Sequence, residues 1–327
     1  MINRRSFIRG ASTLALGATL APVVFSQDGT PPRILFGYPR GGVGTDLGEG
    51  VAKLLAAHGG ERYRFDHVEG RNTRLATEQA KQATHDGRSL LMVNSSSFTL
   101  LPSVYKDIRY DPLTDFIPIA LLGRYAFSLT VGPAVPKSVT TLDHYLDWVM
   151  HNGEFRNVGA AIYGSMGYLA IKVLARDKGV PLRAQPYMGP HSMIDDLRTG
   201  VIAAAFTPPG NAAGGRYSDA LRTIGVTTSA RLPYWPQVPT LIEQGAPHLD
   251  MTGWFGWFAP AGTPMAYVEA LQGHLEAVAN DPAFSMLQRQ LLLSGVDMDA
   301  QTIREDIRVE RDRFAQMASL YDIKKLD

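Results

Sequence analysis

The chain has 327 residues, of which 45% are hydrophobic and 19% are charged, and its formal net charge is +1. This length provides for two domains with a core each, and the composition excludes a disordered chain and a basic surface for nucleic acid. Because the sequence has no cysteine, disulfides, thiolate metal sites and cysteine nucleophiles are excluded as well.

The first 26 residues are typical of an export signal. Residues 3–9, Asn-Arg-Arg-Ser-Phe-Ile-Arg, resemble the twin-arginine motif. The apolar segment 11–21 is shorter than the roughly 20 residues that a membrane-spanning helix needs. Small residues before Gln27 indicate a cleavage site. The sequence thus predicts a periplasmic protein exported with a cleaved twin-arginine-type signal at 1–26, and a retained membrane anchor is the alternative.

From residue 31 on, apolar strand-like runs alternate with amphipathic segments. Strands are predicted at 34–36, 90–93, 117–122, 127–131, 201–206 and 221–226, with a break at Gly123, and helices at 46–57, 75–84, 142–150, 169–178 and 193–199. This alternation favours an α/β architecture with mostly parallel sheets. The last third has an aromatic strand at 254–258. It is followed by predicted helices at 264–278, 284–293 and 302–320. We interpret 302–320 as an amphipathic helix packed on a domain, with a partner-binding helix as the alternative.

A glycine-rich turn, Tyr38-Pro39-Arg40-Gly41-Gly42-Val43-Gly44-Thr45-Asp46, joins the first predicted strand to the first predicted helix. Such a turn leaves backbone N–H groups unpaired near the positive end of the helix dipole, which suits a phosphate or a carboxylate. Arg40 could pair with a ligand carboxylate there, and a solvated surface arginine is the alternative. Asp46 is expected to cap the helix rather than to contact a ligand.

A second turn of the same kind runs from 157 to 168 and contains Gly164, Ser165 and Tyr168. Two such turns that face each other would hold a small anion between two helix N-termini. Neither turn has the glycine spacing of a dinucleotide site, and the second lacks the glycine that a nucleophile elbow places two residues before its serine. The spacing therefore disfavours a nucleotide and leaves a phosphate or a carboxylate as the ligand.

Further polar candidates lie elsewhere in the chain. Ser95 and Ser96, in the run 94–97, could donate hydrogen bonds to a ligand or satisfy loop backbone groups. His191 could line a pocket or pack within its loop, and the aromatic strand 254–258 could be core or a cleft wall. The eight histidines show no metal-ligand spacing, so no metal and no cofactor are expected.

Several motifs together resemble the Bug family, the periplasmic receptors of tripartite tricarboxylate transporters. The first turn is similar to the family's first loop, and the resemblance covers nearly all of the mature chain. The other matching motifs are Asp86-Gly87…Leu90-Leu91, Tyr110-Asp111-Pro112…Asp115-Phe116…Pro118, Pro186-Tyr187-x-Gly189, Val238-Pro239-Thr240 and Trp254-Phe255-Gly256…Phe258-Ala259-Pro260-Ala261-Gly262-Thr263-Pro264.

The resemblance implies a two-lobed Venus-flytrap fold with a mixed sheet in each lobe and a ligand in the cleft. Lobe 1 would comprise 27–127 and 254–327, and lobe 2 would comprise 128–253. A ligand carboxylate would be held by the two turns, largely through N–H groups and ordered waters. The predicted ligand-binding residues are Tyr38, Arg40, Gly41, Gly42, Thr45, Asp46, Ser95, Ser96, Gly164, Ser165, Tyr168, His191 and Thr207.

This sequence departs from the family pattern at several of these positions. Arg40 stands where proline is common, Tyr168 where histidine is common, and Thr207 where many amino-acid-binding members have aspartate. Without that aspartate an amino-acid ligand is disfavoured, because its ammonium group would lack a partner. We expect a non-enzymatic, monomeric receptor for a small organic carboxylate that delivers it to the membrane subunits of a transporter. A ligand-sensing partner of a signalling protein and a periplasmic carboxylate or ester enzyme are the alternatives.

Overall fold

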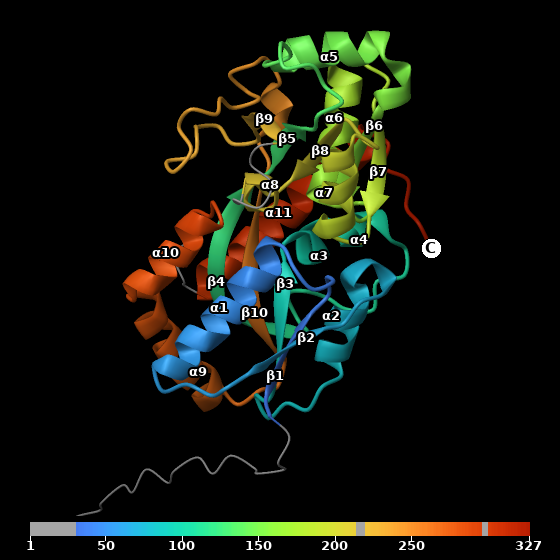
Figure 1. The fold of residues 1–327 in the computed structure, drawn as a ribbon. Helices are drawn as coiled ribbons and strands as arrows, with labels where there is room; N and C mark the ends of the chain where they lie inside the picture. The colour runs from blue at the N-terminus through green and yellow to red at the C-terminus, as the bar shows by residue number, and fades with distance from the viewer. Residues whose placement is uncertain (1–30, 214–219, 296–299) are drawn as a thin grey trace, which may run out of the picture. The chain divides into compact units, whose positions relative to one another are not determined.

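The computed structural model describes residues 31–213, 220–295 and 300–327, which belong to one unit, 31–327. The predicted export signal at 1–26 lies outside the described residues. Among those that are described, no helix combines the length and the apolar character needed to cross a bilayer. The described chain forms two five-stranded sheets covered by helices (Figure 1).

The first sheet has the strand order β2-β1-β3-β10-β4. Strand β1 is parallel to β2 and β3, whereas β10 is antiparallel to β3 and β4. Its strands are β1 (Arg33–Phe36), β2 (Arg64–His67), β3 (Ser89–Asn94), β4 (Phe116–Ala126) and β10 (Thr252–Pro260). Its helices are α1 (Val43–Ala57), α2 (Arg74–Lys81), α3 (Ser96–Thr99), α4 (Leu101–Val104), α9 (Met265–Ala279), α10 (Pro282–Gln290) and α11 (Ala300–Leu320), with a 3₁₀ turn at Arg71–Thr73.

The second sheet repeats this arrangement with the strand order β7-β6-β8-β5-β9. Strand β6 is parallel to β7 and β8, and β5 is antiparallel to β8 and β9. Its strands are β5 (Ser128–Val131), β6 (Asn157–Ala161), β7 (Arg183–Tyr187), β8 (Ala204–Thr207) and β9 (Arg222–Val226). The remaining helices are α5 (Leu142–His151), α6 (Met166–Asp177), α7 (Pro190–Thr199) and α8 (Pro209–Ala213), with 3₁₀ turns at Gly153–Phe155 and Pro247–Leu249.

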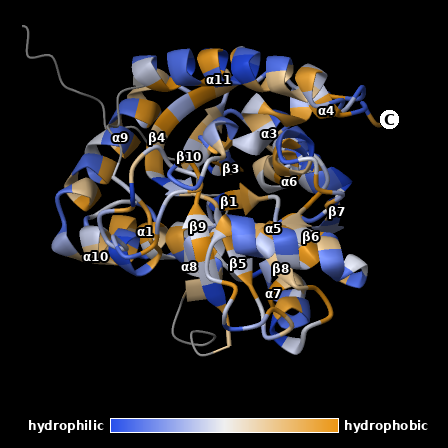
Figure 2. Cartoon of the chain, turned by 90° about the horizontal axis from the view of Figure 1, so that it is seen from above, coloured by the Kyte–Doolittle hydropathy of each residue, from blue (hydrophilic) through white to orange (hydrophobic). Residues whose placement is uncertain are grey.

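The first sheet has a hydrophobic core on each of its two faces, because the side chains of successive residues along β1 point to opposite faces. Ile34 and Phe36 belong to the cluster that contains Leu47 of α1, whereas Leu35 belongs to the cluster that contains Ile303 of α11. Figure 2 shows that hydrophilic and hydrophobic residues interleave along α11. The prediction that this helix packs on a domain is confirmed by the burial of its apolar face.

Three chain segments meet between the two sheets and are held together by Thr227, which is fully buried. Its Oγ1 accepts a hydrogen bond from the N–H of Phe127 at 2.8 Å and donates one to the carbonyl of Met251 at 2.6 Å. Strand β4 of the first sheet ends at Ala126, and β5 of the second begins at Ser128. The chain therefore passes from one sheet to the other at Phe127, and it returns after Met251.

Two expectations about these sheets are wrong. The sheets are mixed rather than mostly parallel, since β5 and β10 run antiparallel to both of their neighbours. Strand β4 also continues through Gly123, where a break was expected. It does so because its pairing with β10 extends to Ala126, with shifts of register between Phe255 and Gly256 and between Trp257 and Phe258. The mixed sheets do confirm the fold that the family resemblance implies.

Candidate ligand-binding site

A pocket lies between the loops of the two sheets and contains about 550 Å³ of empty space, part of it open to solvent. The first sheet contributes the ends of β1 and β3, the start of α1 and part of β10. The second contributes the ends of β6 and β8, the starts of α6 and α7, and α8. The lining residues are Phe36, Tyr38, Gly41, Gly42, Val43, Gly44, Asn94, Ser96, Phe127, Ala161, Ser165, Pro190, Phe206, Pro208, Asn211 and Phe255.

The first turn is held in place by Thr45, which is buried in the first turn of α1. Its Oγ1 accepts a hydrogen bond from the N–H of Gly41 at 2.9 Å and donates one to the carbonyl of the same residue at 3.1 Å. Gly41 and Gly42 have φ values of 98° and 79°, which side chains other than glycine rarely adopt. The N–H groups of Gly42 and Gly44 have no acceptor among the described residues. This turn therefore presents free donors to the pocket.

The expectation that Asp46 caps α1 is wrong. The helix begins at Val43, three residues earlier than predicted, so the N-cap position is taken by Gly42, which has no side chain. Asp46 is exposed in the first helical turn, where its negative charge interacts favourably with the positive end of the helix dipole. Its N–H bonds to the carbonyl of Gly42 at 3.1 Å.

The second turn ends at Ser165, whose Oγ caps α6 by accepting a hydrogen bond from the N–H of Tyr168 at 3.2 Å. Gly164, with φ of 73°, packs against Val104 and does not line the pocket. The ring of Tyr168 packs on Tyr163 with 4.5 Å between centroids, also away from the pocket lining. Of the residues predicted in this turn, only Ser165 faces the pocket.

Loops of the second sheet lie directly on the first turn. The amide of Asn211 connects them, because its Oδ1 accepts from the N–H of Val43 at 2.9 Å while its Nδ2 donates to Thr207 Oγ1 at 2.8 Å. A Cβ on Gly41 would overlap the imidazole of His191, and one on Gly42 would lie 2.5 Å from Pro190. His191 thus packs on the turn instead of lining the pocket, and Thr207 orients Asn211.

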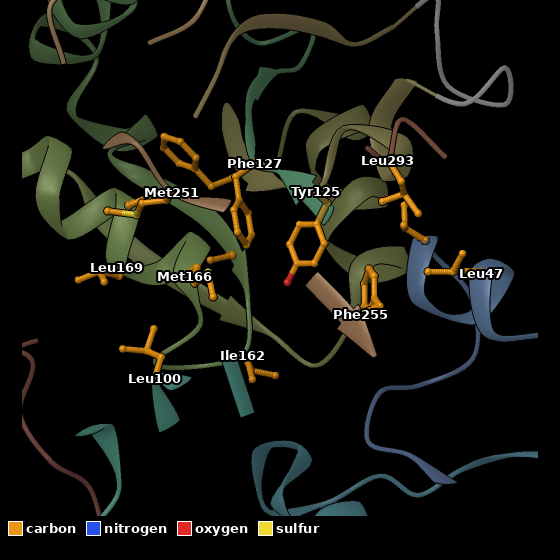
Figure 3. Packing of buried hydrophobic residues seen from close by; sticks show 14 of the residues in the cluster. Leu47, Leu100, Tyr125, Phe127, Ile162, Met166, Leu169, Met251, Phe255 and Leu293 are labelled. Carbon is orange, nitrogen blue, oxygen red and sulfur yellow. The ribbon is translucent and has the colours of Figure 1, made fainter. Parts of the chain in front are cut away.

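Aromatic rings form much of the remaining wall. Phe36 lies 5.4 Å from Tyr38 and 6.4 Å from Phe255, measured between ring centroids. Figure 3 shows Tyr125 between Phe127 and Phe255, and the centroid distances are 5.4 and 4.8 Å. Burial raises the pKa of Tyr38, so its hydroxyl remains a neutral group in the physiological range. Phe255 shows that the aromatic strand serves as both core and pocket wall.

The serine run 94–97 divides between pocket and core. Ser96 lines the pocket and is 1% exposed as a residue. Ser95 is fully buried, and its Oγ accepts from the N–H of Trp254 at 3.2 Å. Ser96 is therefore a candidate ligand contact, whereas Ser95 joins β3 to β10.

Arg40 points away from the pocket, which favours the alternative of a surface arginine. Its side chain is 72% exposed and forms an ion pair with Glu49 at 3.0 Å. It borders a surface hollow together with Lys53 and Arg64 instead. In the described part of the chain, no group of three or more His, Cys, Asp or Glu residues could hold a metal ion.

The sequence patterns did not single out Asn211, Phe36, Phe127 or Phe206 as pocket residues, whereas Asn94 and Phe255 lie in the segments 94–97 and 254–258 that were considered for a ligand contact and a cleft wall. Phe36, Phe127 and Phe206 read as strand core, because each lies in or beside an apolar run. Asn211 follows the end of β8 at Thr207, and this position beyond the carboxyl end of a strand is the signal that could have found it.

Comparison with known proteins identifies the family. Residues 66–321 match the tripartite tricarboxylate transporter family receptor, TctC. Protein BugT of Bordetella pertussis is 26% identical over 279 residues, covering 83% of each chain. The UPF0065 protein in the tcbD-tcbE intergenic region of a Pseudomonas species is 24% identical over 322 residues, covering 98% of this chain and 95% of its own.

Solved structures share the fold. R. palustris Rpa4515 with adipate has a TM-score of 0.85 and 24% identity, covering 90% of this chain and 98% of its own. The periplasmic binding protein BugD has a TM-score of 0.82 and 22% identity, covering 90% and 99%. Both support a two-lobed periplasmic-binding-protein fold. The chain belongs to the TctC, or Bug, family of tripartite tricarboxylate transporter receptors, which are periplasmic solute-binding proteins and not enzymes.

Proposed function

We propose that this chain captures a small organic carboxylate in the pocket between its two sheets. The observation that carries the proposal is the placement of two helix starts, those of α1 and α6, at one pocket. Free N–H groups at Gly42 and Gly44 and the hydroxyls of Ser96 and Ser165 supply neutral donors for an anion. The ligand would lie between a lobe of 27–127 plus 254–327 and a lobe of 128–253.

Ligands of related structures support a carboxylate. R. palustris Rpa4515 is described with adipate, and MatC from Rhodopseudomonas palustris, with a TM-score of 0.80 and 21% identity over 88% of this chain, with bound malate. Both ligands are small organic acids. The helix starts of this chain suit such an anion, because the backbone donors need no reorganisation to receive it.

The expected partners are the membrane subunits of a tripartite tricarboxylate transporter, which the family name implies. We propose that the chain reaches the periplasm through the twin-arginine-type signal at 1–26 and acts there as a monomer without a cofactor. Replacing Arg4 and Arg5 with lysine should then abolish export, which fractionation of cells would measure. A role beside a membrane signalling protein remains the alternative, and co-purification with transporter subunits would distinguish the two.

A thermal-shift screen of carboxylates on the mature protein tests the proposed function. The protein is unfolded and refolded first, so that any bound ligand is removed. A carboxylate at 1,000 times its dissociation constant should raise the free energy of unfolding by about 4 kcal/mol. Ser96→Ala should reduce the shift, and Ser192→Ala, at an exposed site on α7 outside the pocket lining, should not. A broad panel that produces no shift in the wild-type protein would contradict the proposal.

A further inference from the structure

The pocket lining contains no charged side chain. Among the described residues that form it, every polar side chain is a serine, an asparagine or a tyrosine. Eight others are apolar: Phe36, Val43, Phe127, Ala161, Pro190, Phe206, Pro208 and Phe255. This composition restricts which carboxylates can be buried here, because a carboxylate out of water needs several donors or a cation.

The donors in this pocket suffice for one carboxylate. Ser96 contributes a hydroxyl to the pocket lining, and the N–H groups of Gly42 and Gly44 have no acceptor in the described chain. Ser165 accepts from Tyr168, so its hydroxyl proton remains available to an anion. Asn211, by contrast, is engaged at both amide atoms by Val43 and Thr207.

Aromatic rings border both helix starts that supply these donors. At α1, a Cβ on Gly44 would lie 2.5 Å from Phe36 and 3.0 Å from Phe255, so both rings lie directly beneath this residue. At α6, a Cβ on Gly167 would lie 3.4 Å from the ring of Phe127 and 3.0 Å from the carbonyl of Phe206. A carboxylate held at either start therefore has an apolar wall next to it.

Arg40, the basic residue of the first turn, is not available to the ligand. Arg40 follows Pro39 and precedes Gly41, but its guanidinium pairs with Glu49 on the outer side of α1. His191 packs against Gly41 and is absent from the lining. A second carboxylate on the ligand would thus meet aromatic and aliphatic groups and neutral polar side chains such as Tyr38 and Asn94, without a counter-charge.

We propose that the pocket selects a monocarboxylate with an apolar body and discriminates against dicarboxylates. This inference rests on the proposed function, since it assigns the ligand class of the same pocket. The single carboxylate lies at the donors of α1 and α6, and the apolar body lies among the phenylalanine rings. Desolvation of a second, unpaired carboxylate opposes binding of the corresponding diacid.

Calorimetric titration of the refolded mature protein with matched acids tests the inference. The pairs are hexanoate with adipate and benzoate with benzene-1,4-dicarboxylate, and each differs by one carboxyl group. We expect the monocarboxylate of each pair to bind roughly tenfold tighter or more, as burial of an unpaired charge predicts. Affinity should also rise by roughly tenfold or more from acetate to hexanoate, as burial of four methylene groups predicts.

Equal or tighter binding of the diacids would overturn the inference and leave the proposed function intact. Failure of every acid to bind would overturn both. Arg40→Ala provides a second measurement, because its exposed position should leave the monoacid-to-diacid ratio of affinities unchanged. A selective loss of diacid affinity in that variant would show that Arg40 reaches the ligand, and would likewise overturn the inference.

Discussion

Gly41 combines two constraints that no other residue type satisfies. Its φ of 98° disfavours side chains, and a Cβ there would overlap the ring of His191 at the start of α7. We expect Gly41→Ala to separate the two loops and to weaken carboxylate binding by roughly tenfold or more, the effect of about 1.4 kcal/mol. Calorimetric titration measures this loss, and circular dichroism checks that the fold is retained.

Two further variants make this test specific. Gly179 also has a positive φ, of 64°, and a Cβ added there would have no atom within 4 Å. Gly179→Ala therefore introduces backbone strain alone, and the variant should bind the carboxylate normally. Adding His191→Ala to Gly41→Ala should restore affinity by removing the overlapping ring. If the double variant binds as weakly as Gly41→Ala, the overlap is not the cause of the loss.

At single residues, the sequence predicted the backbone of the site better than its side chains. Gly41, Gly42 and Ser165 line the pocket because glycine positions and helix starts follow from local chain geometry. Arg40 and Ser95 do not line it, because the side chains of neighbouring residues point to different sides of the chain. The direction of each side chain cannot be read from the sequence. Tertiary packing decides it.

At the level of elements, the strongly apolar strands and most helices were predictable from the sequence. The strands at the sheet edges and the exact ends of the elements were not. Strands β2 and β7 were missed because Arg64–His67 and Arg183–Tyr187 lie at sheet edges and carry charged or polar residues. The start of α1 was predicted three residues late, since Gly42 and Gly44, which have low helix propensity, lie at its beginning. Pairing within the sheet, rather than local propensity, defines these boundaries.

Helix α11 carries a buried carboxyl that should make folding stability depend on pH. Glu310 accepts a hydrogen bond from Trp254 Nε1 at 2.9 Å and lies 3.4 Å from Arg124 Nη1. Burial raises the pKa of Glu310 to about 7, although Trp254 and Arg124 act in the opposite direction. Between about pH 4.5 and pH 7 the folded state therefore holds a proton that the unfolded state has released.

The free energy of unfolding should consequently fall as the pH rises through this window and level off above pH 7. Over the window, Glu310 contributes a decline of about 3 kcal/mol. Glu310→Gln cannot titrate, so its decline between pH 5 and pH 8 should be smaller by that amount. Urea unfolding at a series of pH values measures the difference. Parallel curves for the variant and the wild-type protein would rule out titration of Glu310 in this range.

At the scale of the whole described unit, several polar contacts join the parts of the chain that carry the two sheets; the Asn72 amide, for example, donates to the carbonyl of Tyr163 at 3.1 Å. Asn211 supplies one of them, by accepting from the N–H of Val43. Asn211→Ala removes this hydrogen bond and should weaken carboxylate binding by roughly twofold to tenfold, as loss of one hydrogen bond predicts. The reason is that the ligand must then bring the two loops together without it.

A matched asparagine separates this effect from general destabilisation. Asn152 donates to the carbonyl of Trp148 at 2.7 Å at the end of α5, away from the pocket lining. Asn152→Ala should lower the melting temperature without changing carboxylate affinity. Unaltered affinity in Asn211→Ala, measured by the same titration, would mean that this contact does not support the ligand-bound arrangement.

A crystal structure of the refolded mature protein with the tightest-binding carboxylate is the most direct measurement. We predict that the ligand occupies the pocket between the two sheets, with its carboxylate within about 3 Å of the N–H of Gly42 or Gly44 and of the Ser96 or Ser165 hydroxyl. Its body should lie against Phe36, Phe127 or Phe255. A carboxylate paired with Arg40, or a ligand bound outside this pocket, would contradict the prediction.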